Sequence, residues 1–107
     1  MKERVYKKLV RDNIPGIIRR QGETPVTRTL DSQEYARCLE EKLREEVEEF
    51  LAGKNQDELG DILEVLEALA RLQGWSWEDV RRAKEDKTRR NGAFRDRVFL
   101  EKVIEEE

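Results

Sequence analysis

Residues 42–61 read KLREEVEEFLAGKNQDELGD, and this stretch decides the fold. Two acidic clusters lie on either side of a short break around Gly53: Glu45, Glu46 and Glu49 come before it, Glu58 and Asp61 after it. The apolar residues between the acids recur at helical spacing. We therefore interpret the stretch as a metal-binding carboxylate site built on two antiparallel helices.

The same periodicity, with start and stop signals, extends outward along the chain. The predicted helices are a short one over Ile14 to Arg20, a long one from Asp31 or Ser32 to about Leu51, a second long one from Asn55 or Asp57 to about Gln73, and a third from Ser76 to about Arg90. Residues 26–30 alternate as a short strand would, and residues 95–104, a short strand or extended tail, could pair with them in a minor two-stranded β pairing. We expect an all-α helical bundle, forming a single domain over residues 1–107.

Composition indicates that this domain is not self-sufficient. Charged residues make up 44% of the 107-residue chain and the hydrophobic class only 36%. A core of this size is marginal on its own, so burial against a second copy is expected. We predict a homodimer or homotetramer with an oligomeric core of the four-helix type.

Several kinds of chemistry are excluded by what the sequence lacks. It has no histidine, which removes Ser-His-Asp and Cys-His catalysis and ordinary zinc sites, and no glycine-rich phosphate loop. The single cysteine, Cys38, cannot form an internal disulfide, which suits a reducing, cytoplasmic location. No apolar run approaches the length of a membrane span, so no membrane partner is expected.

The net charge of −3 conceals a segregated distribution. Counted from the sequence, residues 1–28 carry +5, residues 31–64 carry −8 and residues 80–97 carry +5. An acidic centre between basic flanks suits a cation together with an anionic ligand, and it argues against nucleic acid as the partner.

Acids at helical spacing usually mark a solvated helix face, so the metal interpretation needs further support. Glu41, Glu45 and Glu49 form a like-charge ladder without an intervening base, which is unfavourable unless cations relieve it. At 100° per residue, Glu46 and Glu58 lie about 100° from the apolar stripes of their helices, and Glu49 and Asp61 about 160°. An antiparallel hairpin would therefore bring four carboxylates together.

The second long helix also has a second apolar stripe on its acidic side, formed by Val65, Ala68 and Leu72. A helix that is apolar on two sides is buried on two sides, so the acids are expected to face another helical layer. Several carboxylates in such a place need a hard cation. Mg²⁺ fits because it takes oxygen ligands and bridges to substrate phosphates, and Mn²⁺ is the alternative ion.

At this point the motifs resemble a known family. Lys42-x-x-Glu45-Glu46-x-x-Glu49 followed by Glu58-x-x-Asp61 resembles the MazG-like all-α nucleoside triphosphate pyrophosphohydrolases, which are related to phosphoribosyl-ATP pyrophosphohydrolase. Residues 8–15, KLVRDNIP, and 87–94, KTRRNGAF, look like motifs of a MazG-related subgroup. The subgroup usually shows Arg-Gly-Gly-Phe in the last motif, whereas this chain has the one-residue-longer Arg-Asn-Gly-Ala-Phe.

The resemblance implies Mg²⁺-dependent hydrolysis of a nucleotide between the α and β phosphates, giving a nucleoside monophosphate and pyrophosphate, with a role in sanitising the nucleotide pool. The implied metal ligands are Glu46, Glu49, Glu58 and Asp61. Glu45 is implied as a further ligand or base, so that the catalytic candidates are Glu45, Glu46 and Glu49. The candidate phosphate-binding side chains are Lys8, Arg11, Lys42, Lys84, Lys87 and Arg90.

Two alternatives stay open. Within the same chemistry, the substrate could be phosphoribosyl-ATP, which would make the protein a histidine-biosynthesis enzyme. In a different class, the chain could be a non-catalytic helical dimerisation module, in which Val65, Ala68 and Leu72 form the interface and the acids only solubilise it.

Overall fold

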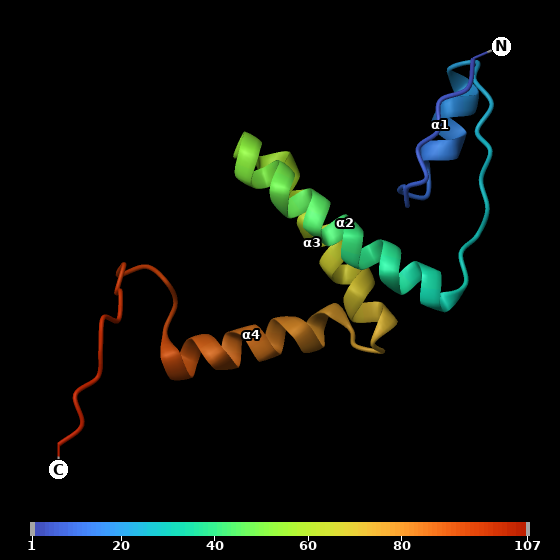
Figure 1. Ribbon diagram of the computed structural model, residues 1–107. Coiled ribbons are helices and arrows are strands. Elements are labelled where there is room, and N and C mark those ends of the chain that lie inside the picture. The colour runs from blue at the N-terminus through green and yellow to red at the C-terminus, as the bar shows by residue number, and fades with distance from the viewer. Residues whose placement is uncertain (1, 107) are drawn as a thin grey trace.

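The computed structural model describes residues 2–106 and is all-helical, with four α-helices and no strand in that range (Figure 1). The helices are α1 (Ile14–Arg20), α2 (Ser32–Gly53), α3 (Gln56–Leu72) and α4 (Trp77–Asn91). The all-α prediction is confirmed, and each helix boundary lies within two residues of the predicted one.

The helices begin where polar side chains can accept a hydrogen bond from a free backbone N–H. Asp31 accepts from the Glu34 N–H at the start of α2, and Asn55 accepts from the Glu58 N–H at the start of α3. Ser76 and Asp79 form a reciprocal capping box at the start of α4. Local chemistry therefore sets these starts without help from tertiary contacts.

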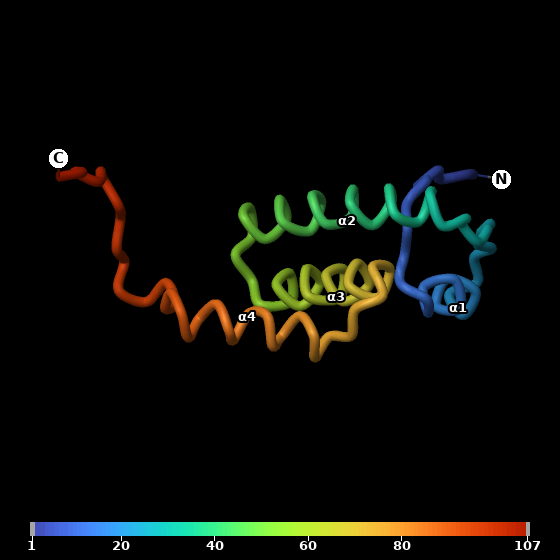
Figure 2. The backbone as a smooth tube through the Cα atoms, turned by 90° about the horizontal axis from the view of Figure 1, so that it is seen from below, coloured from blue at the N-terminus to red at the C-terminus, as the bar shows by residue number. Residues whose placement is uncertain are grey.

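Helices α2 and α3 form an antiparallel hairpin, and they lie side by side along their length (Figure 2). Lys54 turns the chain between them with a left-handed backbone, φ +57°. The buried apolar side chains of the described residues are Leu39, Val65 and Ala70, all on these two helices. The hairpin is thus the packed part of the molecule.

Each helix of the hairpin is rotated about its own axis relative to the orientation that its main apolar stripe predicts. Glu46 is only 6% exposed, whereas its neighbour Val47 is 37% exposed. On α3 the stripe formed by Val65, Ala68 and Leu72 is buried or half-buried, while Leu63 is exposed. Glu46 on α2 and the Val65, Ala68 and Leu72 stripe on α3 therefore turn toward the partner helix, and part of the main apolar stripe turns to solvent.

The expected β pairing between residues 26–30 and 95–104 is wrong. Neither segment forms a strand, and they lie at opposite ends of a molecule that measures 74 × 31 × 24 Å (Figure 1). The first segment joins α1 to α2, and the second follows α4, which carries the chain away from the hairpin. Alternation over five residues gave a strand pattern, but the helices between the two segments hold them apart.

In residues 2–106 no helix is both long enough and apolar enough to cross a membrane.

Candidate active site at the acidic side of the hairpin

Glu46 is the buried carboxylate of the hairpin. It is 6% exposed, and its Oε2 has no hydrogen-bond partner in the described part of the chain. Loss of water is the largest effect on its pKa and raises it, and hydrogen bonding with Glu49 raises it further. The negative charges of Glu49 and Asp61 act in the same direction, while Lys42 opposes them. Glu46, Glu49 and Asp61 are thus close enough to interact electrostatically, although Asp61 comes from the other helix.

Glu58 lies at the start of α3, beside the end of α2. Its Oε2 is buried and, within residues 2–106, also has no hydrogen-bond partner. A Cβ placed on Gly53 would lie 2.8 Å from this Oε2 and 3.0 Å from Oε1. The glycine at the end of α2 therefore leaves the room that the Glu58 carboxylate occupies.

A segment before α1 brings positive charge onto these acids. Lys8 Nζ lies 3.0 Å from Glu45 Oε1, and Arg11 Nη2 lies 2.7 Å from Asp61 Oδ1. The hydrogen bond to Glu45 is the main cause that raises the pKa of Lys8, and the charges of Glu49 and Glu46 add to it. We call residues 7–12 the N-terminal arm; through side-chain ion pairs it places one cation at α2 and one at α3.

Lys42 supplies a third cation from within α2. Its Nζ lies 3.5 Å from Oε1 of Glu46, four residues later, and 3.8 Å from Oε1 of Glu45, three residues later. Both spacings place the side chains on the same face of the helix. Lys42 is half-buried, so it accompanies the buried carboxylate of Glu46 rather than extending into solvent. Its charge lowers the pKa of Glu46, against the larger effect of burial.

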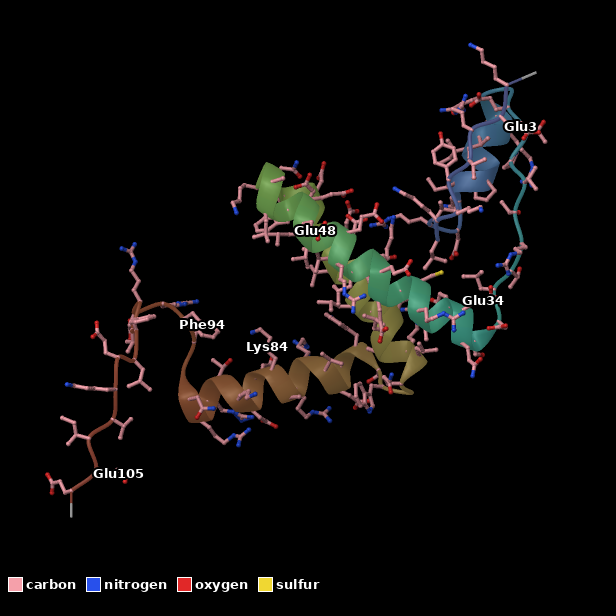
Figure 3. The ribbon with its side chains drawn as sticks, viewed as in Figure 1. Glu3, Glu34, Glu48, Lys84, Phe94 and Glu105 are labelled. Atoms are coloured by element: carbon pink, nitrogen blue, oxygen red, sulfur yellow. The ribbon has the colours of Figure 1, made fainter. Side chains whose placement is uncertain are left out.

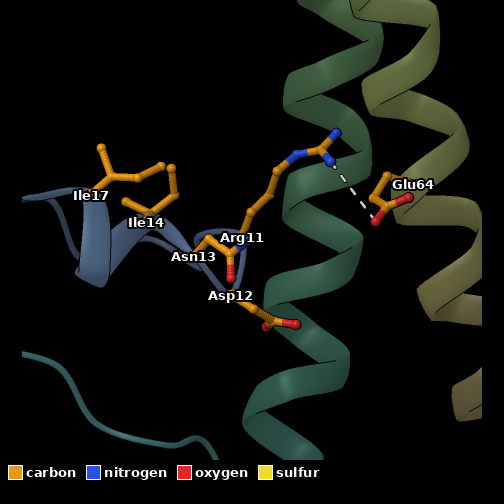
Figure 4. A pocket seen from close by; sticks show the side chains of 6 residues that line it. All are labelled: Arg11, Asp12, Asn13, Ile14, Ile17 and Glu64. Carbon is orange, nitrogen blue, oxygen red and sulfur yellow. Dashed lines mark ion pairs between the residues drawn. The ribbon is translucent and has the colours of Figure 1, made fainter.

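A hollow of about 370 Å³ opens beside the N-terminal arm, where the arm joins α1. Figure 4 shows Arg11 reaching across it toward Glu64, whose Oε1 lies 3.8 Å from Arg11 Nη1. Ile14 and Ile17 give the hollow an apolar wall, and Asp12 and Asn13 also line it. Because Arg11 contacts both this hollow and Asp61, the hollow adjoins the acidic side of the hairpin.

The predicted basic residues of α4 stand apart from this group. Lys84 lies on α4, which leads away from the hairpin, whereas Glu48 lies on the second half of α2 (Figure 3). In the described chain neither Lys84 nor Lys87 pairs with a carboxylate, and Arg90 donates to the Asp86 carbonyl of its own helix. The structure therefore brings Lys8, Arg11 and Lys42 to the acids but leaves the α4 cations exposed.

The residues present suit a hard divalent cation in their donor chemistry. The acids offer oxygen atoms only, two of those oxygens are buried without partners, and like charges are held together. As the side chains stand, no three or more His, Cys, Asp or Glu groups in residues 2–106 are arranged to hold a metal ion. A cation would need the carboxylates to rotate, and Arg11 to give up its ion pair with Asp61.

Two contributors were missed from the sequence. Glu64 pairs with Arg11, and its place one turn after Asp61 on the same helix was a usable signal. Gly53 was predicted only as a helix stop, and nothing in the sequence shows that its missing side chain makes room for Glu58.

Part of this chain is similar in sequence to a bacterial protein. An uncharacterized protein of Mycolicibacterium smegmatis (strain ATCC 700084 / mc(2)155) is 53% identical over 49 residues, which cover 46% of this chain and 50% of that protein. The chain therefore spans about half the length of the curated relative it matches. No protein-family model matches the chain, and no solved structure matches it. Function has to be argued from the acidic side of the hairpin.

Proposed function

We propose that this chain is a Mg²⁺-dependent nucleotide pyrophosphohydrolase that hydrolyses a nucleoside triphosphate between its α and β phosphates. The single observation that carries the proposal is the arrangement around Glu46. The Glu46 carboxylate is 6% exposed, has an oxygen without a partner and interacts with acids of both helices, so its charged form is unfavourable. Lys42, 3.5 Å from its other oxygen, offsets only part of this, and a divalent cation would offset the rest.

The proposed ligands are Glu46 and Glu49 on α2 with Glu58 and Asp61 on α3. When bound, Mg²⁺ would neutralise charge on the phosphates and on the attacking oxygen. Glu45 is the acid that the ligand set leaves free. It is half-buried, and its carboxylate would accept the proton of the attacking water, with the ion pairs to Lys8 and Lys42 keeping it ionised until then.

The N-terminal arm would contribute phosphate binding. Lys8 and Arg11 already lie at the acids, and their ion pairs are solvent-exposed, so exchanging a carboxylate for a phosphate oxygen costs little. The hollow beside Arg11, with its apolar wall of Ile14 and Ile17, offers room for the nucleoside. The basic residues of α4, Lys84, Lys87 and Arg90, remain candidates for binding outer phosphates.

Membership of the MazG-like family, cytoplasmic location and a role in nucleotide-pool sanitation belong to the same proposal. They are supported by the order and spacing of the motifs at residues 8–15, 42–61 and 87–94, and by an all-α fold in which the first two motifs meet. The expected homodimer or homotetramer is part of the same proposal.

The proposal is tested by incubating the protein with a panel of nucleoside triphosphates and phosphoribosyl-ATP, with and without Mg²⁺, while pyrophosphate and nucleoside monophosphate are measured. We expect Mg²⁺-dependent release of both products. Glu49→Gln and Asp61→Asn should abolish release, while Glu48→Gln, which makes the same change on the same helix, should not. Full activity in Glu49→Gln, or release without a divalent ion, would contradict the proposal. Preference for phosphoribosyl-ATP would assign the chain to histidine biosynthesis.

A second candidate function, a non-catalytic helical interaction module, is favoured by one observation. The hairpin exposes apolar residues such as Leu59 and Leu63 at 46% and 50%. This alternative predicts no thermal shift with Mg²⁺ and a non-hydrolysable nucleotide, so a clear shift that Glu49→Gln removes would argue against it.

A further inference from the structure

Arg11 of the N-terminal arm contacts two acids of α3 at once. Its Nη2 lies 2.7 Å from Asp61 Oδ1, and its Nη1 lies 3.8 Å from Glu64 Oε1, the pair drawn in Figure 4. Asp61 and Glu64 are three residues apart, so they share one face of the helix. A guanidinium can serve both because its N–H groups form a rigid fork. Of the two partners, only Asp61 belongs to the proposed metal ligands.

The polar contacts between the N-terminal arm and the hairpin are made by side chains. Lys8 pairs with Glu45, and Arg11 pairs with Asp61 and Glu64. Within residues 2–106, no backbone hydrogen bond joins the arm to α2 or α3, and α1, which follows the arm, makes no close backbone contact with either helix. Both pairs of Arg11 are solvent-exposed, so each contributes little to stability. Arg11 can therefore release an acid without disturbing the hairpin.

Asp61 cannot serve Arg11 and a divalent cation equally well. The charge of Asp61 acts on Glu46, so Asp61 lies within electrostatic reach of the acids of α2. While its Oδ1 accepts from Arg11, no three acids of the described chain converge to hold a metal ion. A divalent cation on this carboxylate would also repel a guanidinium that lies 2.7 Å from it. Arg11 and the cation therefore compete for Asp61.

Glu64 offers Arg11 a partner that the cation does not need. It lies outside the proposed ligand set, and its side chain is 56% exposed, so it can follow a small movement of the guanidinium. When Asp61 turns to a cation, the contact with Glu64 keeps Arg11 beside the acids and leaves Nη2 free. A free N–H group on an arginine held in this way suits a phosphate oxygen. Glu64 is thus a positioning residue, because it acts on the substrate only through Arg11.

We propose that Asp61 and Glu64 are successive partners of Arg11: the arm competes with a divalent cation for Asp61, and once the cation is bound, Glu64 holds the guanidinium beside the site for a substrate phosphate. This inference rests on the proposed metal site and adds its regulation by the arm. Because the cation frees the N–H group that a phosphate uses, binding of either one strengthens binding of the other.

The first test measures the Mn²⁺ affinity of the full chain without nucleotide, by electron paramagnetic resonance of the free ion. Arg11→Gln should bind Mn²⁺ about three- to fivefold more tightly than wild type, because loss of an exposed ion pair frees Asp61. Lys8→Gln removes the same charge from the arm, but the partner of Lys8 is Glu45, outside the ligand set, so affinity should rise less than about twofold. A role of Arg11 in phosphate binding alone would leave this affinity unchanged.

The second test follows the Arg11 guanidinium by nitrogen nuclear magnetic resonance, with Arg11→Gln to identify its signals. An ion pair that hinders rotation about the Nε–Cζ bond separates the two Nη resonances, and free rotation averages them. In wild type, Mg²⁺ should shift both resonances and leave them separate, because Glu64 still holds the group. In Glu64→Gln they should average once Mg²⁺ is added, while Glu67→Gln, three residues further along α3, should behave like wild type.

Equal Mn²⁺ affinity of wild type and Arg11→Gln, or an equal gain in Lys8→Gln, would overturn the proposal. Arg11 resonances that saturating Mg²⁺ leaves unchanged, or that stay separate in Glu64→Gln with Mg²⁺, would do the same. Any of these results together with Mg²⁺-dependent pyrophosphate release would leave the enzymatic function standing. No Mn²⁺ binding by either wild type or Arg11→Gln would contradict the metal site itself and this inference with it.

Discussion

Arg11 Nη2 lies 2.7 Å from Asp61 Oδ1, although 50 residues separate the two in sequence. This contact joins the N-terminal arm to α3, as the contact of Lys8 with Glu45 joins it to α2. Both ion pairs are solvent-exposed and contribute little to stability. Their importance is positional, because they hold two cations where an anionic ligand of the carboxylate site would arrive.

Arg11→Gln should therefore affect substrate use more than folding. Loss of one charge-assisted contact to a phosphate costs about 1.5–3 kcal/mol, or about 10–100-fold in kcat/KM. The free energy of unfolding should change by less than about 1 kcal/mol. Arg4→Gln, which removes an exposed Arg–Glu pair with Glu23, is the matched control. Equal kinetic effects of both changes would show that Arg11 has no specific role.

Glu46→Gln should stabilise the apo protein at neutral pH. Burial raises the pKa of Glu46 above its ordinary 4.5, so the folded state binds its proton more tightly than the unfolded state. Stability that this group contributes in acid is therefore lost as pH rises through the folded pKa. The amide avoids that loss, and we expect a gain of about 1–3 kcal/mol at pH 7, which should disappear below pH 4.5.

Urea unfolding of wild type and Glu46→Gln between pH 4 and 8 measures this difference, with Glu48→Gln as the control for net charge. Mg²⁺ should stabilise wild type and not Glu46→Gln. A variant that is less stable than wild type at pH 7 would show that the buried carboxylate is satisfied without a cation.

Gly53→Ala tests the carboxylate site without destabilising the fold. Alanine favours the last turn of α2 by up to about 1 kcal/mol over glycine, but its Cβ would lie within 3.0 Å of both Glu58 carboxylate oxygens. The flexible side chain can move away, so stability should hold while Mg²⁺-dependent activity falls about tenfold or more. Gly16→Ala, where the nearest atom is 3.6 Å away on a flexible arginine, is the control. Unchanged kinetics in Gly53→Ala would remove Glu58 from the ligand set.

The exposed lysines of α4 give a prediction about phosphate binding. Lys84→Ala with Lys87→Ala should raise KM and leave kcat nearly unchanged, because these side chains contribute charge at a distance from the acids. Arg81→Ala is the control, since Arg81 is engaged by Glu78 and Glu85 on its own helix. If both variants behave alike in steady-state kinetics, the lysines have no part in substrate binding.

The fold was largely predictable because its determinants are local. Caps at Asp31, Asn55 and Ser76 depend on neighbours in sequence, and they helped to give the helix limits within two residues. Gly53 was expected to end α2, but the helix includes it and ends at Lys54, whose backbone is left-handed. The rotation of the hairpin was not predictable from the apolar stripes. Glu46 was expected about 100° from the buried face, yet it is buried beside α3 while Val47 is exposed.

Periodicity shows which faces are apolar, but it does not show which of them meets the neighbouring helix and which stays exposed on the chain. The same limit applies to the site. The spacing of the acids indicated a cluster, whereas the arrival of Arg11 at Asp61 depends on the tertiary path of residues 7–12, which no local pattern encodes. The predicted β pairing was wrong for a similar reason. Two segments must lie side by side to pair as strands, and their residues do not show whether the fold brings them together.

The most direct test of the central claim is the binding of Mn²⁺, monitored by electron paramagnetic resonance as the free ion disappears from solution. If α2 and α3 together hold one divalent cation, wild type should bind it, and either Glu49→Gln on α2 or Asp61→Asn on α3 should weaken binding at least tenfold. Glu48→Gln should bind like wild type. Equal binding by all four proteins, or no binding by wild type, would contradict a shared site between the two helices.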